Sequence, residues 1–301
     1  MRAALLKSYG GVDQFVIDDI PMPEPGAGEV LIRIEASAVN PFDLIVRQGN
    51  MAKLIPLQLP AVLGGDASGV ITRVGTGVNA FSVGDRVIAD FATNGRGAHA
   101  EYGVAPTTAI AKLPANLSFE QGAALPKAGL TGRETVDALG VGPGARVLVS
   151  GGLGAVGRTA IQYLQEIGAQ PVAGVRPERL DEARALAGEA IDITAAPASA
   201  SFDFAISTAG TVVPSLVANV RNGGRIISIV PVPDGSDAGG RVSIQPLYHR
   251  TDAHMLAVVA EAAARGALVI PIAKAFRLEQ IGAAHAAVAA GSPGKVVLSH
   301  A

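Results

Sequence analysis

The sequence contains no cysteine and no tryptophan, and only 4% of its residues are aromatic. Without cysteine the chain forms no disulfide, offers no thiolate to a zinc ion and has no Cys nucleophile. Charge of either sign is nearly balanced, with 24 Lys and Arg against 26 Asp and Glu and a formal net charge of −2. Since no basic run occurs, the composition argues against nucleic-acid binding and against an anionic membrane surface as a partner.

Long hydrophobic runs are also missing, since no stretch of about 18 apolar residues occurs. The first ten residues, Met1–Gly10, have neither the apolar core nor the cleavage site of a signal peptide. We therefore expect a cytoplasmic protein that spans no membrane. The 301 residues are enough for two ordinary domains, and the charge balance favours small-molecule chemistry.

Short apolar runs separated by Gly and Pro fill the chain up to about residue 115. This spacing is typical of a β-rich domain and suits a partly closed barrel. The expected strands are Ala3–Leu6, Phe15–Ile17, Val30–Ile34, Val70–Val74, Val87–Ala89 and Ile110–Leu113.

From about residue 120 the pattern changes, and helical periods alternate with apolar strands. This alternation is typical of a doubly wound α/β sheet. Helices are expected over Thr211–Arg221, stopped by Asn222-Gly223-Gly224, and over Thr251–Arg265, with Thr251 as N-cap. The expected strands are Arg146–Ser150, Pro171–Val175, Phe202–Ile206 and Arg225–Val230.

After this alternation ends, the tail predicts strand, helix and strand in that order. The apolar stretches that indicate them are Ala267–Ile272, Phe276, Leu278–Ala290 and Lys295–Leu298. We expect the tail to return to the first domain. The predicted division is a catalytic domain of residues 1–120 with 271–301 and a dinucleotide-binding domain of residues 121–270.

A glycine motif follows the strand Arg146–Ser150. Gly152, Gly154 and Gly157 fit G-x-G-x-x-G, whose glycines permit a tight turn and close approach of the backbone to a pyrophosphate. The next residues predict a helix, whose first-turn N–H groups, those of Ala155 and Val156 among them, would face the phosphates. The sequence thus predicts a Rossmann-type βαβ unit that binds a dinucleotide.

Several stretches, all in the expected order, resemble the medium-chain dehydrogenase/reductase superfamily and within it the zinc-independent quinone oxidoreductase branch. The resemblance implies a catalytic domain like a chaperonin-type partial barrel, built from both chain ends, with the Rossmann-type domain inserted. We also expect a homodimer. The stretches are Glu35–Asp43, Leu63–Val70 with Val74-Gly75, Phe81–Val87, Ala100–Tyr102, Leu125-Pro126 with Gly129–Thr131, the glycine turn and Gly294–Leu298.

The chain departs from the zinc-dependent relatives at the metal. Those relatives hold it with a Cys and a Gly-His-Glu motif, whereas Asn40 stands here at the Cys position and Gly65 and Asp66 replace His and Glu. One carboxylate does not make a site of three protein ligands. We therefore expect a metal-free protein that delivers hydride to an acceptor that is already electrophilic.

Three residues are candidates for the reaction site. Asn40 could donate a hydrogen bond to a substrate carbonyl or position the nicotinamide ribose, or it could be a loop Asn that bonds its own backbone. Lys127 could anchor an anionic substrate, donate a proton or simply face solvent. By the resemblance Thr131 would lie beside the nicotinamide, although it could also cap a helix. His99, His254, His285 and His300 lack ligand spacing and are interpreted as ordinary surface or helix residues, and Tyr248 and His249 are weaker candidates for substrate contacts.

Arg176 follows the second strand of the βαβ unit, where an NAD-specific fold would carry an acidic residue. A cation there favours NADPH, unless Arg176 is only a surface residue, and Arg179 could form the other half of a phosphate clamp. Thr208, Ile229 and Val230 follow parallel strands at the carboxyl edge, where ligands bind.

The sequence therefore predicts an NADPH-dependent reductase of quinones or α,β-unsaturated carbonyls. Two alternatives stay open. One is an enoyl reductase that acts on a biosynthetic intermediate, and the other is an NADPH-binding sensor or scaffold with little catalysis.

Overall fold

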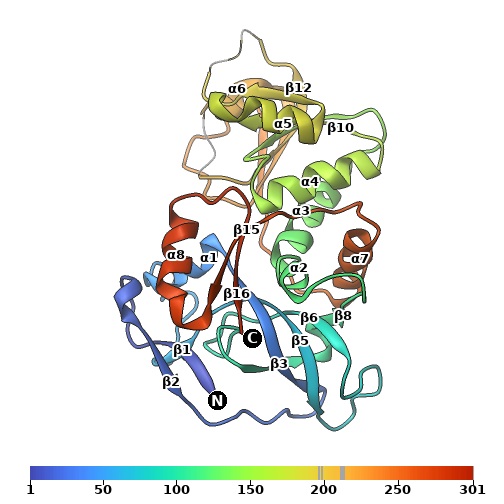
Figure 1. Cartoon of the computed structure of the whole chain (residues 1–301). Coiled ribbons are helices and arrows are strands. Elements are labelled where there is room, and N and C mark those ends of the chain that lie inside the picture. The colour runs from blue at the N-terminus through green and yellow to red at the C-terminus, as the bar shows by residue number, and fades with distance from the viewer. Residues whose placement is uncertain (196, 198, 211–213, 301) are drawn as a thin grey trace. The chain divides into compact units, whose positions relative to one another are not determined.

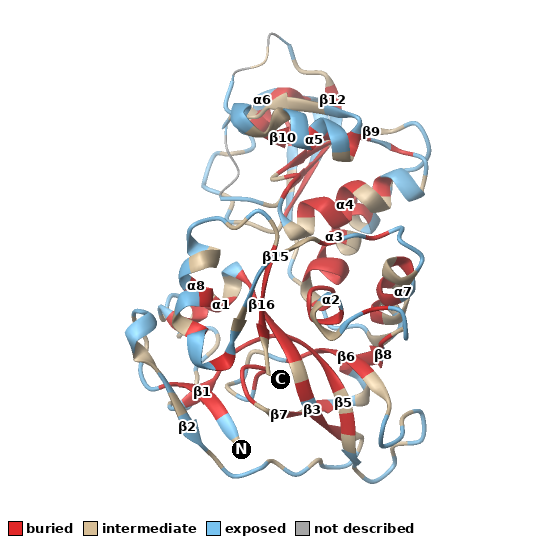
Figure 2. Ribbon diagram, viewed as in Figure 1, coloured by how far each residue is buried: buried red, intermediate tan, exposed pale blue. Residues whose placement is uncertain are grey.

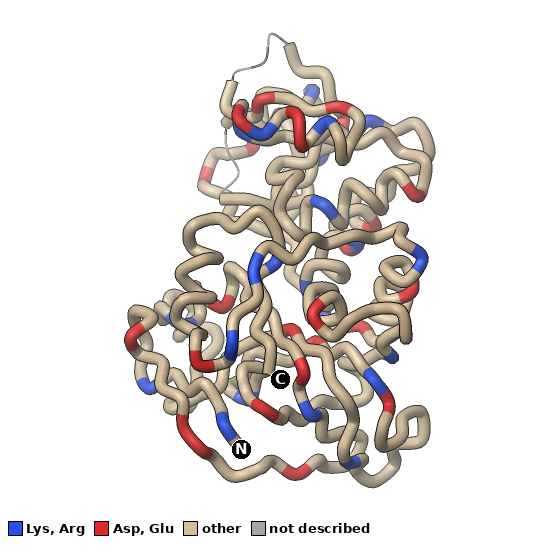
Figure 3. The backbone as a smooth tube through the Cα atoms, in the orientation of Figure 1, with Lys and Arg blue, Asp and Glu red and all other residues tan. Residues whose placement is uncertain are grey.

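The computed structural model describes the whole chain except residues 196, 198, 211–213 and 301. Of the helices in this described part, none has both the length and the apolar character that crossing a membrane demands. Lys and Arg are interspersed with Asp and Glu along the described trace (Figure 3), in agreement with the small net charge of the sequence.

The chain forms two compact units (Figure 1). The first unit comprises Met1–Lys127, Thr251–Gly266 and Ile270–Ala301, and the second comprises Ala128–Arg250 and Ala267–Val269. The first unit thus contains both ends of the chain, together with an internal helical segment.

Antiparallel pairing dominates the first unit, and each of the six runs predicted there lies in a strand or overlaps one. The larger sheet has the order β15-β16-β3-β5-β6-β8 with β7 also paired to β3, and the smaller has the order β2-β1-β4. The described strands form an open sheet, in keeping with a partial rather than a closed barrel. The strands are β1 (Arg2–Leu6), β2 (Phe15–Asp19), β3 (Glu29–Val39), β4 (Ala61–Val62), β5 (Asp66–Val74), β6 (Arg86–Asp90), β7 (Tyr102–Pro106), β8 (Ile110–Lys112), β15 (Ile272–Arg277) and β16 (Lys295–Ser299).

Alternation along β3 explains the core of this unit. Val30, Ile32 and Ile34 point to one face, as the two-residue period of a strand requires, and pack there with Ile71 of β5 and Val87 of β6. Much of β3 and β5 is buried in Figure 2.

In the second unit every neighbouring pair of strands is parallel. The order β11-β10-β9-β12-β13-β14 is that of a doubly wound sheet, and its direction of winding reverses at β9. This confirms the predicted α/β fold. The strands are β9 (Arg146–Ser150), β10 (Gln170–Val175), β11 (Glu189–Asp192), β12 (Phe202–Ser207), β13 (Val220–Ser228) and β14 (Ser243–Pro246).

Helices cover both faces of this sheet, so its strands are apolar at consecutive positions. In β9, Val147 and Val149 pack with Leu164 of α4, whereas Leu148 packs with Leu216 of α6. The helices of the chain are α1 (Pro41–Arg47), α2 (Phe119–Ala123), α3 (Pro126–Leu139), α4 (Ala155–Glu166), α5 (Leu180–Ala187), α6 (Pro214–Asn219), α7 (Ala253–Ala264) and α8 (Ile281–Ala289), with 3₁₀ turns η1 (Val12–Gln14), η2 (Thr107–Ala109), η3 (Pro177–Arg179) and η4 (Leu278–Gln280).

Two predicted helix boundaries were wrong. Asp252 rather than Thr251 caps α7, because the Asp252 carboxylate accepts the N–H of Met255 at 2.9 Å while the Thr251 hydroxyl donates to Asp90. Residues 222–224 do not stop a helix but lie within β13, where the pairing with β12 is irregular. Of the helix predicted over 211–221, residues 211–213 lie outside the described part of the chain.

The first strand predicted in the tail exists but was placed too early, at Ala267–Ile272. The strand β15 begins at Ile272, which is the last residue of the predicted stretch and directly follows Pro271. Proline has no N–H to donate to a neighbouring strand, which explains why regular pairing begins only there.

Candidate active site

A buried polar cluster lies at the junction of three neighbouring strands of the first unit. In the register of the sheet, Val296 of β16 pairs with Val39 of β3, and Ala38 pairs with Asp66 of β5. This register brings Lys295, Asn40 and Asp66 together from distant parts of the sequence. We call these three residues with Asp43, Asp90 and Lys127 the Asp66 cluster.

Both carboxylate oxygens of Asp66 accept hydrogen bonds inside the protein. Oδ2 accepts from Lys295 Nζ at 2.9 Å and from Asn40 Nδ2 at 3.0 Å, and Oδ1 accepts from the N–H of Lys127 at 2.9 Å. The side chain of Asp66 is 0% exposed and that of Lys295 is 4% exposed. The ion pair therefore lies away from water, where unpaired charges would be costly.

Asn40 is the N-cap of α1, and Pro41 takes the first helical position. Its N–H donates to Asp43 Oδ2 at 2.7 Å, and its side-chain amide contacts Asp66 and Lys295. Burial raises the pKa of Asp43 to about 6, although the hydrogen bond from Asn40 opposes the rise. The sequence motif predicted none of these contacts.

The Lys127 side chain is committed to the cluster. Its Nζ donates to Asp90 Oδ1 at 2.6 Å and to the Phe91 carbonyl at 3.3 Å, and Asp90 Oδ2 accepts from Thr251 Oγ1 at 2.6 Å. Burial would lower the pKa of Lys127, but Asp90 and Asp66 raise it. The raised pKa makes the Lys127 ammonium a weak acid at neutral pH, which favours an anchoring role over donation of a proton.

In the second unit, the glycine-rich turn joins β9 to α4. Gly151 has a φ of +75°, a left-handed conformation that favours glycine, although the predicted motif begins one residue later. A Cβ on Gly157 would lie 2.3 Å from the Gly151 carbonyl oxygen, and one on Gly152 would lie 3.0 Å from side-chain atoms of Ala173 and Ile161. These glycines let the turn approach both the helix and the sheet.

The N-terminus of α4 fits a phosphate group. Its N-cap, Gly154, has no side chain to bond the first-turn N–H groups. The N–H of Arg158 donates to the Gly154 carbonyl at 2.8 Å, so those of Ala155, Val156 and Gly157 come before the first helical hydrogen bond. They lie at the positive end of the helix dipole, and the residues present therefore suit the pyrophosphate of a dinucleotide.

The carboxyl ends of β9, β12 and β13 form the sheet edge beside this turn. Thr208 Oγ1 donates to the Ser150 carbonyl at 2.8 Å, and the N–H of Ile229 donates to the Ser207 carbonyl at 3.1 Å. Val230 follows directly, and its N–H donates to the Ser228 hydroxyl at 3.2 Å. The strand ends are thus tied to one another at the edge where the fold binds ligands.

Arg176 stands at the end of β10, and its side chain is 73% exposed with an ion pair to Glu178 at 3.2 Å. Arg179 instead pairs with Glu182, which also accepts from the buried Arg158. Burial would raise the pKa of Glu182, but the bonds from Arg179 and Arg158 lower it. Arg158 also donates to the Leu153 carbonyl at 3.0 Å and so supports the glycine turn, a role that no sequence signal indicated.

Thr131 lies in the interior of α3, which excludes the alternative role of helix cap. Its Oγ1 is 3.0 Å from Nδ1 of His249, and the same nitrogen is 3.9 Å from Glu134 Oε2. The second unit thus brings together two residues that the sequence had considered separately.

The comparisons with known proteins agree with this geometry. The Alcohol dehydrogenase GroES-like domain family matches residues 26–115, and the Zinc-binding dehydrogenase family matches residues 181–298. A chloroplastic quinone oxidoreductase of Triphysaria versicolor is 30% identical over 77% of this chain and 76% of its own length. A chloroplastic NADPH-dependent alkenal/one oxidoreductase of Arabidopsis thaliana is 35% identical over 64% of this chain and 53% of its own length. The solved quinone oxidoreductase of Coxiella burnetii is 26% identical and matches 100% of this chain and 99% of its own with a TM-score of 0.88.

The chain belongs to the medium-chain dehydrogenase/reductase superfamily, in its quinone oxidoreductase branch. It is therefore an oxidoreductase of a family that binds a nicotinamide cofactor, NAD(P)H.

One matching family is a zinc-binding one, but the Asp66 cluster does not fit a catalytic zinc ion. Gly65 contributes no ligand, and a Cβ there would lie 1.9 Å from Lys127 Cε, so the lysine fills that space. Asp66 already accepts from an ammonium and two N–H groups. Within the described residues, no three His, Asp or Glu side chains gather as a metal would require.

The interpretation of the histidines as surface or helix residues was wrong for His99, which is buried outside any helix, whereas His285 does lie in a helix, α8, although it is buried there. His99 and His285 are fully buried with their ring centroids 6.1 Å apart. Ser37 Oγ lies 3.1 Å from His99 Nδ1 and 3.0 Å from His300 Nε2. Burial lowers the pKa of His285 to about 3 and that of His300 to about 4, because the charged form loses its hydration.

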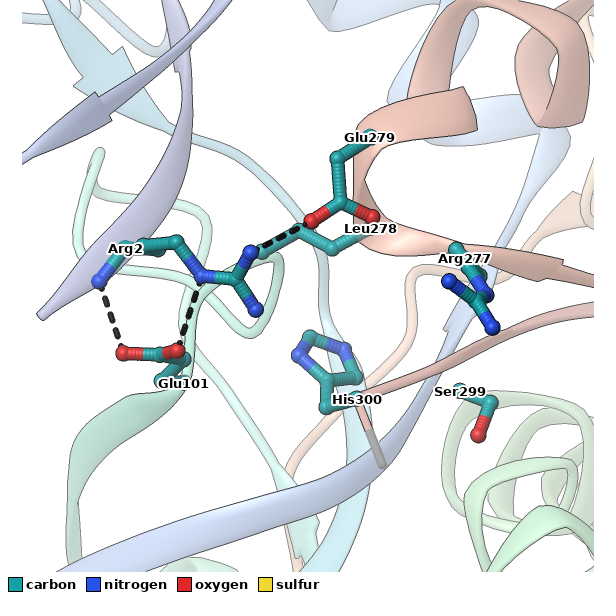
Figure 4. Close-up of a pocket in the computed structure, with 7 residues that line it drawn as sticks. All are labelled: Arg2, Glu101, Arg277, Leu278, Glu279, Ser299 and His300. Atoms are coloured by element: carbon teal, nitrogen blue, oxygen red, sulfur yellow. Dashed lines mark hydrogen bonds and ion pairs between the residues drawn. The ribbon is translucent and has the colours of Figure 1, made fainter.

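A small pocket beside His300 is lined by ion-paired side chains. Arg2 Nε donates to Glu101 Oε1 at 3.0 Å and Arg2 NH1 donates to Glu279 Oε1 at 2.8 Å, and His300 lies beside them (Figure 4). Arg277 also lines the pocket, so two guanidinium groups face two carboxylates and the lining has no net charge to attract an ionic ligand.

Proposed function

We propose that the protein is an NADPH-dependent reductase of quinones or α,β-unsaturated carbonyls that works without a metal. The observation that carries this proposal is the donor set of the Asp66 cluster. Asn40, Gly65 and Asp66 stand at the zinc-ligand positions, and the Asp66 carboxylate already accepts hydrogen bonds on both oxygens. The ammonium groups of Lys295 and Lys127 lie beside carboxylates of the cluster. Such a site offers no Lewis acid to activate an alcohol, so an acceptor that is already electron-poor suits it best.

The preference for NADPH rests on Arg176. It follows β10, the strand after the glycine turn, and neither it nor the next residue is the acid that would bind a ribose 2′-hydroxyl. Its exposed guanidinium suits a 2′-phosphate, because a planar fork of N–H donors matches phosphate oxygens. Arg179 is the second candidate, although a phosphate would have to compete with Glu182 for it.

The chain contributes position and electrostatics to the reaction. NADPH, when bound, supplies a hydride from its nicotinamide ring. The first-turn N–H groups of α4 would hold the pyrophosphate, and Thr131 would lie near the nicotinamide. An N–H of the Asn40 amide would donate to the acceptor's carbonyl oxygen and stabilise the negative charge that develops there. Lys127 would anchor an acceptor that carries an acidic group.

Two other functions are alternatives for the same site. The Arabidopsis relative is named for alkenals and enones, which supports the enone class and also suits an enoyl reductase of a biosynthetic intermediate. The second alternative is not an enzyme but a sensor or scaffold that binds NADPH with little turnover. A homodimer and a cytoplasmic location complete the proposal, and size-exclusion chromatography with light scattering tests the first.

The test follows NADPH oxidation with benzoquinones, naphthoquinones, alkenals and cyclic enones, each class with and without a carboxylate. We expect turnover with at least one class and a lower kcat/KM in Asn40→Ala without loss of folding. Lys127→Met should raise KM only for the carboxylate-bearing acceptors. Tight NADPH binding with no turnover across the panel would favour the sensor, and a loss of kcat for all acceptors in Lys127→Met would make that lysine the proton donor.

A further inference from the structure

Lys295 lies in the stretch Gly294–Leu298, to which the sequence assigned no role beyond resemblance. It is the first residue of β16, and its side chain is 4% exposed. Its Nζ donates to Asn40 Oδ1 at 2.6 Å and to Asp66 Oδ2 at 2.9 Å. Lys295 therefore contacts the candidate reaction residue Asn40 directly, in addition to its ion pair with Asp66.

The ammonium decides which way the Asn40 amide faces. An ammonium group has three donors and no acceptor, so only the oxygen of the amide can lie against it. The opposite orientation would place the NH₂ group against a positive charge. Asp66 supports the same choice from the other side, because a carboxylate accepts only and takes one N–H of Nδ2 at 3.0 Å.

One N–H of Asn40 is then left over. The amide nitrogen carries two hydrogens, and Asp66 accepts one of them. Among the described residues, no acceptor meets the second. Asn40 is also more exposed than Lys295 or Asp66: 8% of its surface is exposed, against 4% and 0%.

We propose that Lys295 is a positioning residue: it fixes the Asn40 amide so that the remaining N–H is presented to the acceptor's carbonyl oxygen. The contact also polarises the amide. An ammonium bonded to Oδ1 draws electron density from the nitrogen, and the N–H becomes a stronger donor to developing negative charge. This inference rests on the proposed reductase function, because it specifies how one of its residues works.

The test compares two ways of replacing the lysine. Lys295→Arg keeps a group that only donates, so it should preserve the amide orientation. Lys295→Met combined with Asp66→Asn removes both charges and avoids leaving a buried carboxylate alone. Lys112→Met is the matched control, since it removes an exposed lysine that is 3.4 Å from Asp85.

The first readout needs no turnover. The side-chain NH₂ signals of Asn40, assigned by their loss in Asn40→Ala, are recorded by ¹⁵N NMR in the nucleotide-free protein. We expect them to stay in place in Lys295→Arg and in Lys112→Met and to move in the double variant. Unchanged signals in a folded double variant would overturn the orienting role, whatever the enzyme's substrate.

The second readout is kinetic, with any acceptor that the wild-type protein reduces. The double variant should lose at least tenfold in kcat with NADPH affinity within threefold of wild type, whereas Lys295→Arg should keep most of kcat. In the Asn40→Ala background, adding Lys295→Met with Asp66→Asn should not lower kcat any further. A full loss of kcat there would contradict action through Asn40. If wild type reduces no acceptor, the proposed function fails while the NMR result still decides the orienting role.

Discussion

The side chain of Lys127 occupies the space that a side chain on Gly65 would need. A Cβ on Gly65 would lie 1.9 Å from Lys127 Cε and 2.9 Å from its Nζ. The same Nζ is 2.6 Å from Asp90 Oδ1, so the lysine cannot move away without leaving a buried carboxylate. The glycine and the lysine therefore fit as a pair at a position where zinc-dependent relatives have a His.

Changes at these two residues should not be additive. We expect Gly65→Ala to destabilise the protein by about 2 kcal/mol because it displaces the ammonium, and Lys127→Ala by about 3 kcal/mol because it removes the ammonium that pairs with the buried Asp90. In the Lys127→Ala background, Gly65→Ala should cost little, which gives a coupling energy above roughly 1 kcal/mol. Urea unfolding of the four proteins measures the cycle, with Gly142→Ala as control because its Cβ would meet nothing within 4 Å. If the two destabilisations were additive, the Lys127 side chain would be able to move aside for a Cβ on residue 65 without a loss of stability.

The donor set of the Asp66 cluster predicts little affinity for zinc. Elemental analysis of protein purified without chelator should show well under one zinc ion per chain, and a chelator should leave NADPH oxidation unchanged. One zinc ion per chain together with turnover that a chelator abolishes would contradict the metal-free assignment.

Charge reversal at Arg176 should affect one nucleotide selectively. Arg176→Glu replaces a contact to the 2′-phosphate by repulsion, and we expect it to weaken NADPH binding by about 2 kcal/mol, roughly 30-fold in Kd, with a much smaller change for NADH. Calorimetry with both nucleotides gives the two constants. Arg184→Glu is the control, since Arg184 is an exposed arginine on α5 paired with Asp181. Equal losses for NADPH and NADH would make Arg176 structural.

A side chain on Gly157 should affect both nucleotides alike. Its Cβ would meet the Gly151 carbonyl oxygen at 2.3 Å, so Gly157→Ala must push the start of α4 away from the turn. Because the phosphate-binding N–H groups move with the helix, we expect at least tenfold weaker binding of NADPH and of NADH. Intrinsic fluorescence is weak without tryptophan, so nucleotide fluorescence or calorimetry is the better measurement. Selective loss of only one nucleotide would contradict this role.

The buried histidines predict acid sensitivity. His285 and His300 have folded pKa values of about 3 and 4, below the ordinary 6.5, so the unfolded chain binds protons that the folded one excludes. Their stabilising effect is complete above pH 6.5 and is lost as pH falls toward 4. Asp43, whose pKa is raised to about 6, acts in the opposite sense over the same range. Since three histidines with lowered pKa values oppose one Asp, the net effect should be loss of stability.

His285→Leu isolates one of these contributions. From pH 6.5 to 5.0 a single excluded proton costs roughly 2 kcal/mol, so the variant should lose about that much less stability than wild type over this interval. Chemical unfolding at both pH values measures the difference. Equal losses in the two proteins would show that His285 is protonated without strain in the folded state.

Much of the fold follows from local patterns in the sequence. Short apolar runs separated by Gly and Pro indicated the strands of the first unit, and apolar strands alternating with helical periods indicated the buried parallel strands of the second. The glycine turn and the helix after it were also predictable, because tight turns and helix starts depend on residues that are neighbours in the chain. The boundaries failed where a distant group competed for a side chain, as when Asp90 takes the hydroxyl of Thr251.

The composition of the reaction site, in contrast, was decided by tertiary structure. The sequence pointed to Asn40 and Lys127 individually, but Lys295 meets Asn40 across 255 positions only because β16 pairs with β3. Likewise, Ser37 contacts two histidines that no spacing relates. A one-dimensional pattern reports which face of a strand is apolar, whereas the register between distant strands is fixed by packing of the whole sheet, and that register alone determines which buried charges become partners.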